Sequence, residues 1–137
     1  MKGIDTLIRL ARRHLDAQRR QVADLERLRD GLVASLRDIA DDIARERAHA
    51  GGGGSFASAF PAFVAAALDR RATLARSLAE AEAAVAEARA RLAERFEEVK
   101  RYEIAADRMR DRLHRAEARR EQAALDEIGL VVHRRGG

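Results

Sequence analysis

The chain has 137 residues, no cysteine, one proline, and only four phenylalanines and one tyrosine as aromatic side chains. A compact core of this size needs large apolar groups, so an ordinary globular domain, including an all-β or α/β enzyme, is excluded. Charged residues make up 36% of the chain, and its richness in Ala, Arg, Glu and Leu is typical of long helices and coiled coils. Without cysteine, disulfides and thiolate chemistry are also excluded, which fits the cytoplasm.

The net charge of +4 comes almost entirely from arginine, because Lys2 and Lys100 are the only lysines. Acidic residues are interspersed with the arginines, so the charge is weak support for nucleic-acid binding, and carboxylates of a protein partner fit equally well. Charges from Arg9 onward interrupt any signal-peptide core. The longest nearly apolar run, Phe60 to Leu68, is too short to span a bilayer.

In chain order, the sequence predicts a first helix over about residues 4–48 and a Gly-rich turn over residues 49–56. Four successive glycines from Gly51 stop a helix, because each costs about 1 kcal/mol relative to alanine. A second helix is predicted over about residues 57–128, with Pro61 in its first turn and Gly129 at its end. Residues 129–137 are expected to form a frayed tail.

Both helices carry apolar residues at a sustained heptad spacing. Ten of thirteen seam positions are apolar in the first helix and sixteen of twenty in the second. Such heptads specify a left-handed coiled coil, and a short turn favours an antiparallel hairpin. The predicted fold is therefore all-α: one coiled-coil hairpin over residues 1–137, with a second helix that extends beyond the first.

Two hairpin registers fit these heptads. The preferred register places Leu25 opposite Val85, which leaves the glycines in the turn, and the alternative register places Leu25 opposite Leu78. In the preferred register about the last twenty residues of the second helix, from near residue 107, have no partner. The apolar stripe nevertheless continues through Met109 and Leu113. Such a stripe fits a frayed end or a crystal contact, but an unpaired apolar stripe favours a partner outside the hairpin.

The sequence contains no catalytic, cofactor-binding or metal-binding constellation. The histidines, His14, His49, His114 and His133, do not stand at metal-ligand spacings from one another, and the glycine run lacks the Lys-Ser/Thr of a phosphate loop. We therefore predict a protein that is not an enzyme, with no catalytic residues, no cofactor and no metal.

The C-terminal part of the second helix resembles a known family. Lys100-x-x-Glu103 is followed by arginines and then by Glu121-Gln122-x-x-Leu125-Asp126-Glu127. With a first helix of about 45 residues, a turn, an aromatic-rich restart and a longer helix, the chain looks like the FliJ family, the small coiled-coil proteins of the bacterial flagellar type III export apparatus.

The resemblance implies a non-enzymatic stalk, similar to the central stalk of rotary ATPases. The end that bears both termini would enter the hexameric flagellar export ATPase, promote ring assembly and couple the ring to a membrane export gate component, with export chaperones as further candidate partners. The protein would lie in the cytoplasm, at the inner membrane through its partners only, and would bind no nucleic acid. The implied ATPase-binding residues are Ile4, Ile8, Arg119, Arg120, Gln122, Leu125, Asp126 and Glu127.

The aromatic residues Phe56, Phe60 and Phe63 cluster near the expected hairpin tip. The residues alone are compatible with an apolar plug that closes the turn and with a docking surface. The resemblance implies that they face the export gate or another partner.

Two other functions fit the same heptads. In a generic dimerising scaffold, two chains pair instead of one chain folding back, and polar seam residues such as Gln18, Arg29, Arg71 and Arg95 set the register. A basic coiled coil that binds nucleic acid would show a steep salt dependence. The interspersed acidic residues, and the lack of base-stacking aromatics beside the basic run, speak against nucleic-acid binding.

Overall fold

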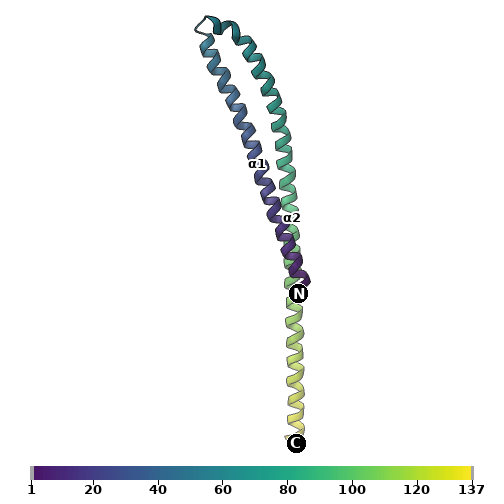
Figure 1. Cartoon of the computed structure of the whole chain (residues 1–137). Coiled ribbons are helices and arrows are strands. Elements are labelled where there is room, and N and C mark those ends of the chain that lie inside the picture. Colours follow the sequence, from purple (N-terminus) through teal and green to yellow (C-terminus); the bar gives the residue numbers. More distant parts are fainter. Residues whose placement is uncertain (1, 137) are drawn as a thin grey trace. The chain divides into compact units, whose positions relative to one another are not determined.

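A computed structural model describes residues 2–136 of the chain, apart from the side chains of Ser55 and Phe56. This part contains two helices, α1 at Lys2–Ala50 and α2 at Ser55–Gly136, and no strand (Figure 1). The predicted all-α fold is confirmed, because α1 and α2 pack against each other and α2 is the longer helix. The chain forms two compact units: a tip unit of residues 16–94, and a terminal unit of residues 1–15 and 95–137.

The turn between the helices is Gly51–Gly54, shorter than the predicted 49–56. The Gly51 amide donates to the Arg47 carbonyl at 3.0 Å, and the next two glycines donate to carbonyls three residues back, both at 3.1 Å. The last turn after α1 is therefore closed by 3₁₀-type hydrogen bonds, from an amide to the carbonyl three residues back. Gly53 and Gly54 have φ values of 82° and 83°, a conformation that glycine adopts without steric cost. These two residues reverse the chain.

Helix α2 extends past the predicted 57–128 at both ends. It begins at Ser55, so Pro61 lies in its second turn rather than its first. It continues through Gly129 to Gly136, so residues 129–136 are helical where a frayed tail was predicted, and Gly137 is outside the described residues. A single glycine inside a helix costs only about 1 kcal/mol. Gly129 also lacks the positive φ typical of a helix-ending glycine.

The core of each unit is one narrow seam between the two helices. The predicted heptads count position a from Ile8 and d from Ile4 in the first helix, and a from Val64 and d from Phe60 in the second. Among the described side chains, every buried apolar one lies at an a or d position, which confirms the heptad assignment. Small alanines alternate with branched residues along this seam. The buried residues are Val22, Ile39, Ala67, Ala81, Val85 and Ala88 in the tip unit, and Ile8, Ala11, Leu15, Val99 and Ala106 in the terminal unit.

Two of the polar residues at seam positions, Gln18 and Arg95, find partners within the same chain. Gln18 is 9% exposed and donates from Nε2 to the carbonyl oxygen of Ala88 at 3.0 Å, across the seam of the tip unit. In the terminal unit, Arg95 pairs with Glu98 at 3.2 Å. The hairpin thus accommodates two of the polar residues that the dimer alternative assigned to pairing between chains.

Two ion pairs between the helices identify the register. Arg89 lies 3.0 Å from Glu26 in the tip unit, and Arg12 lies 3.1 Å from Glu103 in the terminal unit. In the preferred register the two partners of each pair are offset by five residues, roughly 7.5 Å along the helix axis. In the alternative register the offset is twelve residues, roughly 18 Å, which exceeds the reach of the two side chains. The contacts therefore fit only the preferred register.

A pair of cysteines at positions 25 and 85 tests this register. Because the chain has no cysteine of its own, the variant L25C/V85C should form an intramolecular disulfide under mild oxidation, since facing seam residues lie within the roughly 7 Å between Cα atoms that a disulfide needs. The matched variant L25C/L78C should remain reduced. Non-reducing electrophoresis with thiol titration measures both, and preferential cross-linking of L25C/L78C would contradict the register.

Candidate functional site

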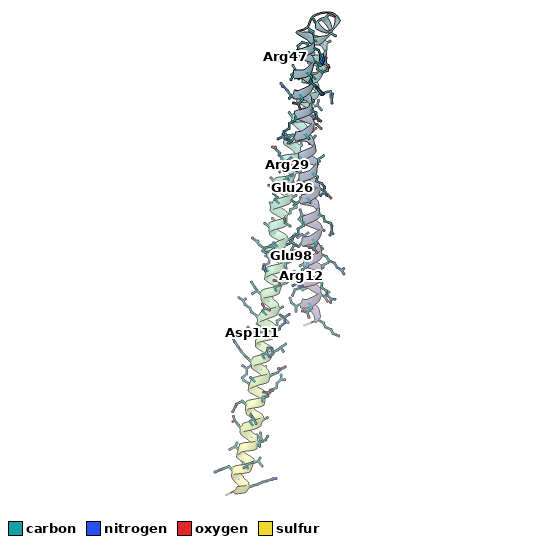
Figure 2. All side chains as sticks on the ribbon, turned by 90° about the vertical axis from the view of Figure 1, so that its left-hand side faces the viewer. Arg12, Glu26, Arg29, Arg47, Glu98 and Asp111 are labelled. Atoms are coloured by element: carbon teal, nitrogen blue, oxygen red, sulfur yellow. The ribbon has the colours of Figure 1, made fainter. Side chains whose placement is uncertain are left out.

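The terminal unit contains a long stretch of α2 without a helical partner. Ala106, 1% exposed, is the last buried seam residue. Residues 107–136, here called the unpaired segment, continue as a helix with no other described segment beside them (Figure 1). Of their described side chains, only Met109 and Ala116 are half-buried and all others are exposed. Figure 2 shows Asp111 on this segment, past the start of α1.

Two apolar stripes run along the unpaired segment. The first continues the seam through Met109, Leu113, Ala116 and Ala123. The second consists of Leu125, Ile128 and Val132, which are 62%, 59% and 63% exposed and follow one another at i, i+3 and i+7. With about 100° of rotation per residue, the second stripe lies on the opposite side of the helix from Ala123. Leu130, 56% exposed, lies within about 20° of Ala123, so the last turns of α2 present apolar groups on two opposite sides.

The structure divides the predicted ATPase-binding residues into two groups. Ile8 is only 7% exposed and Ile4 is half-buried, so these two residues mainly hold the hairpin together. In the register above, Ile4 faces Ala106, and Arg119 lies thirteen residues further along α2, roughly 20 Å away. The exposed group on the unpaired segment is Arg119, Arg120, Gln122, Leu125, Asp126 and Glu127.

In the exposed group the apolar residue Leu125 has polar neighbours, two of which are joined by a hydrogen bond. Gln122 donates from Nε2 to Oδ1 of Asp126 at 2.9 Å, one helical turn away. Leu125 stands between these two residues in sequence and is 62% exposed. An exposed apolar side chain with a polar rim is the arrangement of residues that anchor protein interfaces.

The predicted tip surface lies near the start of α2, in the tip unit. Phe60 is half-buried, as a seam residue should be, and Phe63 is 36% exposed. The side chain of Phe56 falls outside the described side chains. Among the described side chains of this predicted surface, Phe63 is therefore the more exposed ring.

One exposed face of the terminal unit was missed by the sequence analysis. Phe96 and Ile104 are 47% and 49% exposed and lie two turns apart on α2. Lys100 stands between them, with Nζ 5.4 Å from the centroid of the Phe96 ring, a cation–π contact. The spacing of 96, 100 and 104 at i, i+4 and i+8 is the signal that could have revealed this face.

Glu103 links the two helices at the paired end of the terminal unit. It accepts a hydrogen bond from Nη2 of Arg12 at 3.1 Å, and Nζ of Lys100 lies at 3.5 Å. The Arg12 hydrogen bond, with help from Lys100, lowers the pKa of Glu103 against the opposing effect of partial burial. The Lys100-x-x-Glu103 part of the family pattern therefore contributes to the hairpin itself.

Comparison with known families identifies the chain. The family model described as "Flagellar FliJ protein" matches residues 1–137. The chain belongs to the FliJ family. No curated protein and no solved structure matches it.

FliJ proteins form a non-catalytic structural or adaptor family, so this chain is a coiled-coil protein associated with flagellar export, with partners in the flagellar export apparatus. Membership favours the export interpretation over the generic scaffold and the nucleic-acid binder. Along residues 2–136, neither helix has an apolar stretch able to cross a membrane. The same residues contain no group of three or more His, Asp or Glu side chains suited to a metal ion.

The lowered pKa of Glu103 predicts a pH-dependent contribution to stability. The folded state favours the ionised carboxylate, so its contribution is complete above the ordinary pKa of 4.5 and is lost as the pH falls through the lower folded-state value. The variant E103Q should therefore be less stable than the parent chain at pH 7 and equally stable at strongly acidic pH. Thermal unfolding followed by circular dichroism measures this difference, and a constant gap across the whole pH range would contradict the assignment.

Proposed function

We propose that this protein is a non-catalytic stalk and adaptor that inserts the unpaired segment into the hexameric flagellar export ATPase. The observation that supports the proposal is the pair of apolar stripes on opposite sides of one exposed helix. A helix that is apolar on more than one side is normally enclosed by its surroundings, whereas a flat docking surface covers a single side. The pore of a ring can enclose such a helix.

Within this proposal Leu125 is the apolar anchor, and its polar neighbours fix its orientation. Its exposed fraction of 62% leaves most of the side chain free to enter a pocket in the ring. Asp126 and Glu127 then accept hydrogen bonds from the ATPase, and Arg119 and Arg120 donate to its carboxylates. Ile4 and Ile8 contribute indirectly, because they hold the hairpin beside the segment that enters the ring.

One stalk that contacts several ATPase subunits also promotes ring assembly. A ligand that binds the assembled ring and not the separate subunits shifts the equilibrium toward the ring by mass action. In the same proposal the tip unit binds a component of the membrane export gate through Phe56, Phe60 and Phe63. The protein then works at the cytoplasmic face of the inner membrane through its partners, with export chaperones as further candidates.

The substitution L125D tests insertion into the ATPase. Placing a charge at the anchor should weaken ATPase binding by about thirtyfold or more, which corresponds to about 2 kcal/mol. The matched control is L28D, because Leu28 is similarly exposed, at 55%, and belongs to the tip unit. Calorimetry with the purified ATPase measures affinity, and phosphate release measures stimulation of its activity.

Both variants should keep the helicity of the parent chain, because each substitution is made at an exposed position. Equal affinity for L125D and the parent chain would refute Leu125 as the anchor. Equal loss in L125D and L28D would show that the effect is not specific to the unpaired segment.

A further inference from the structure

Five arginines form a single charged face on the second half of α2. Arg101, Arg108, Arg112, Arg115 and Arg119 are all exposed and follow one another at spacings of seven, four, three and four residues. At about 100° per residue these positions fall within roughly 60° of the helix circumference. Asp107 and Glu117 lie elsewhere on that circumference, whereas Asp126, seven residues after Arg119, falls on the same face.

No described carboxylate pairs with any of these five arginines, although the helix forms ion pairs elsewhere. On the same segment, Arg110 pairs with Asp107 at 2.8 Å. Arg112 and Arg119 have no acidic residue three or four positions away in either direction, so the usual ion pairs along a helix face are not available to them. A partner protein can therefore supply their counter-charges.

The arginine face borders the continued seam. In the heptads, Arg112 and Arg119 occupy g positions, next to the seam residues Leu113 and Ala116. Along the paired part of the terminal unit, α1 covers the seam, and the Arg12–Glu103 ion pair joins the two helices beside it. After Ala106, α1 no longer covers the seam side of α2, and that side of the helix is largely exposed.

We propose that Arg108, Arg112, Arg115 and Arg119, here called the arginine edge, bind an acidic helix of a partner protein. This helix packs its apolar residues on the continued seam and presents a row of Asp or Glu side chains to the edge. Guanidinium groups suit this role because they donate two parallel hydrogen bonds to one carboxylate. The inference rests on the proposed function, since the helix is taken to belong to the export ATPase.

The position of the edge favours a protein helix over a phosphate-bearing surface. A helix covers the apolar stripe and the arginines together, which continues the arrangement already present in the hairpin. A nucleic acid would neutralise the arginines but leave Met109, Leu113 and Ala116 in water. A membrane would cover one side of the helix only and leave Leu125 and Val132, on the other side, in water. A pair beside an apolar seam is also less screened by solvent, so each arginine–carboxylate contact is stronger there.

The double variant R112E/R119E tests the arginine edge in the full-length chain. Its affinity for the purified export ATPase should fall by about a hundredfold, because two attractive contacts become repulsive. The control variant R13E/R20E changes the same charge at the same seven-residue spacing, on exposed arginines of α1 that also form no ion pair with a described residue. Its affinity should change by less than about threefold, as is usual for exposed charges.

Salt dependence and a conservative variant add independent readouts. Affinity of the parent chain should decrease with ionic strength, and R112E/R119E should lose this dependence. R112K/R119K keeps the charge but loses the two-pronged donor, so its affinity should lie between those of the parent chain and R112E/R119E. Circular dichroism should show equal helicity for all variants.

The outcomes separate this inference from the proposed function. Failure of the parent chain to bind the ATPase would overturn the proposed function and this assignment together. Binding of R112E/R119E as tight as that of the parent chain would overturn only the arginine edge. Parent-chain binding to phosphatidylglycerol vesicles that R112E/R119E loses, with ATPase affinity unchanged, would assign the edge to an anionic lipid surface instead.

Discussion

The structure depends on one narrow seam in which small and branched side chains of two helices interlock. Every buried apolar residue belongs to it, and many are alanines, which allow close approach but bury little surface. Specificity therefore cannot come from core volume alone. It comes from the few polar contacts that the register permits: the Gln18 amide on a backbone carbonyl, and the Arg89–Glu26 and Arg12–Glu103 pairs.

The same heptad pattern leads to burial in one part of α2 and to exposure in the other, depending on whether α1 packs against it. Where α1 is present, apolar residues such as Val99 are buried, and Glu103 has an arginine beside it. Where α1 is absent, Leu113 is half-exposed, and Arg112 and Arg119 have no carboxylate three or four positions away along the helix. In the proposed function, the unpaired segment forms one half of an interface. Its missing half should resemble α1: a helix with apolar residues at heptad spacing and charges of the opposite sign.

Heptad periodicity was sufficient to predict the two helices and their seam, because burial in a coiled coil follows spacing directly. The ends of α2 were not predictable by the same rule. Gly129 and Pro61 are typical boundary signals, yet both lie inside α2, because the local cost of either residue is outweighed by the strong helix formers around it. The site was predicted only in part. Which residues of the terminal unit stay exposed depends on where α1 ends in space, so Ile8 and Leu125 could not be distinguished from spacing alone.

An exposed helix of this length raises the question of what keeps it ordered. The unpaired segment is rich in alanine, arginine, glutamate and leucine, the residues with the highest helix propensity, and it contains Asp107–Arg110 and Gln122–Asp126 contacts across single turns. The helix also propagates from the packed hairpin, so it needs no nucleation of its own. In the proposed complex the partner meets a preformed helix, and association does not have to order its backbone. The composition that excludes a globular core is therefore suited to a segment that remains helical before its partner is bound.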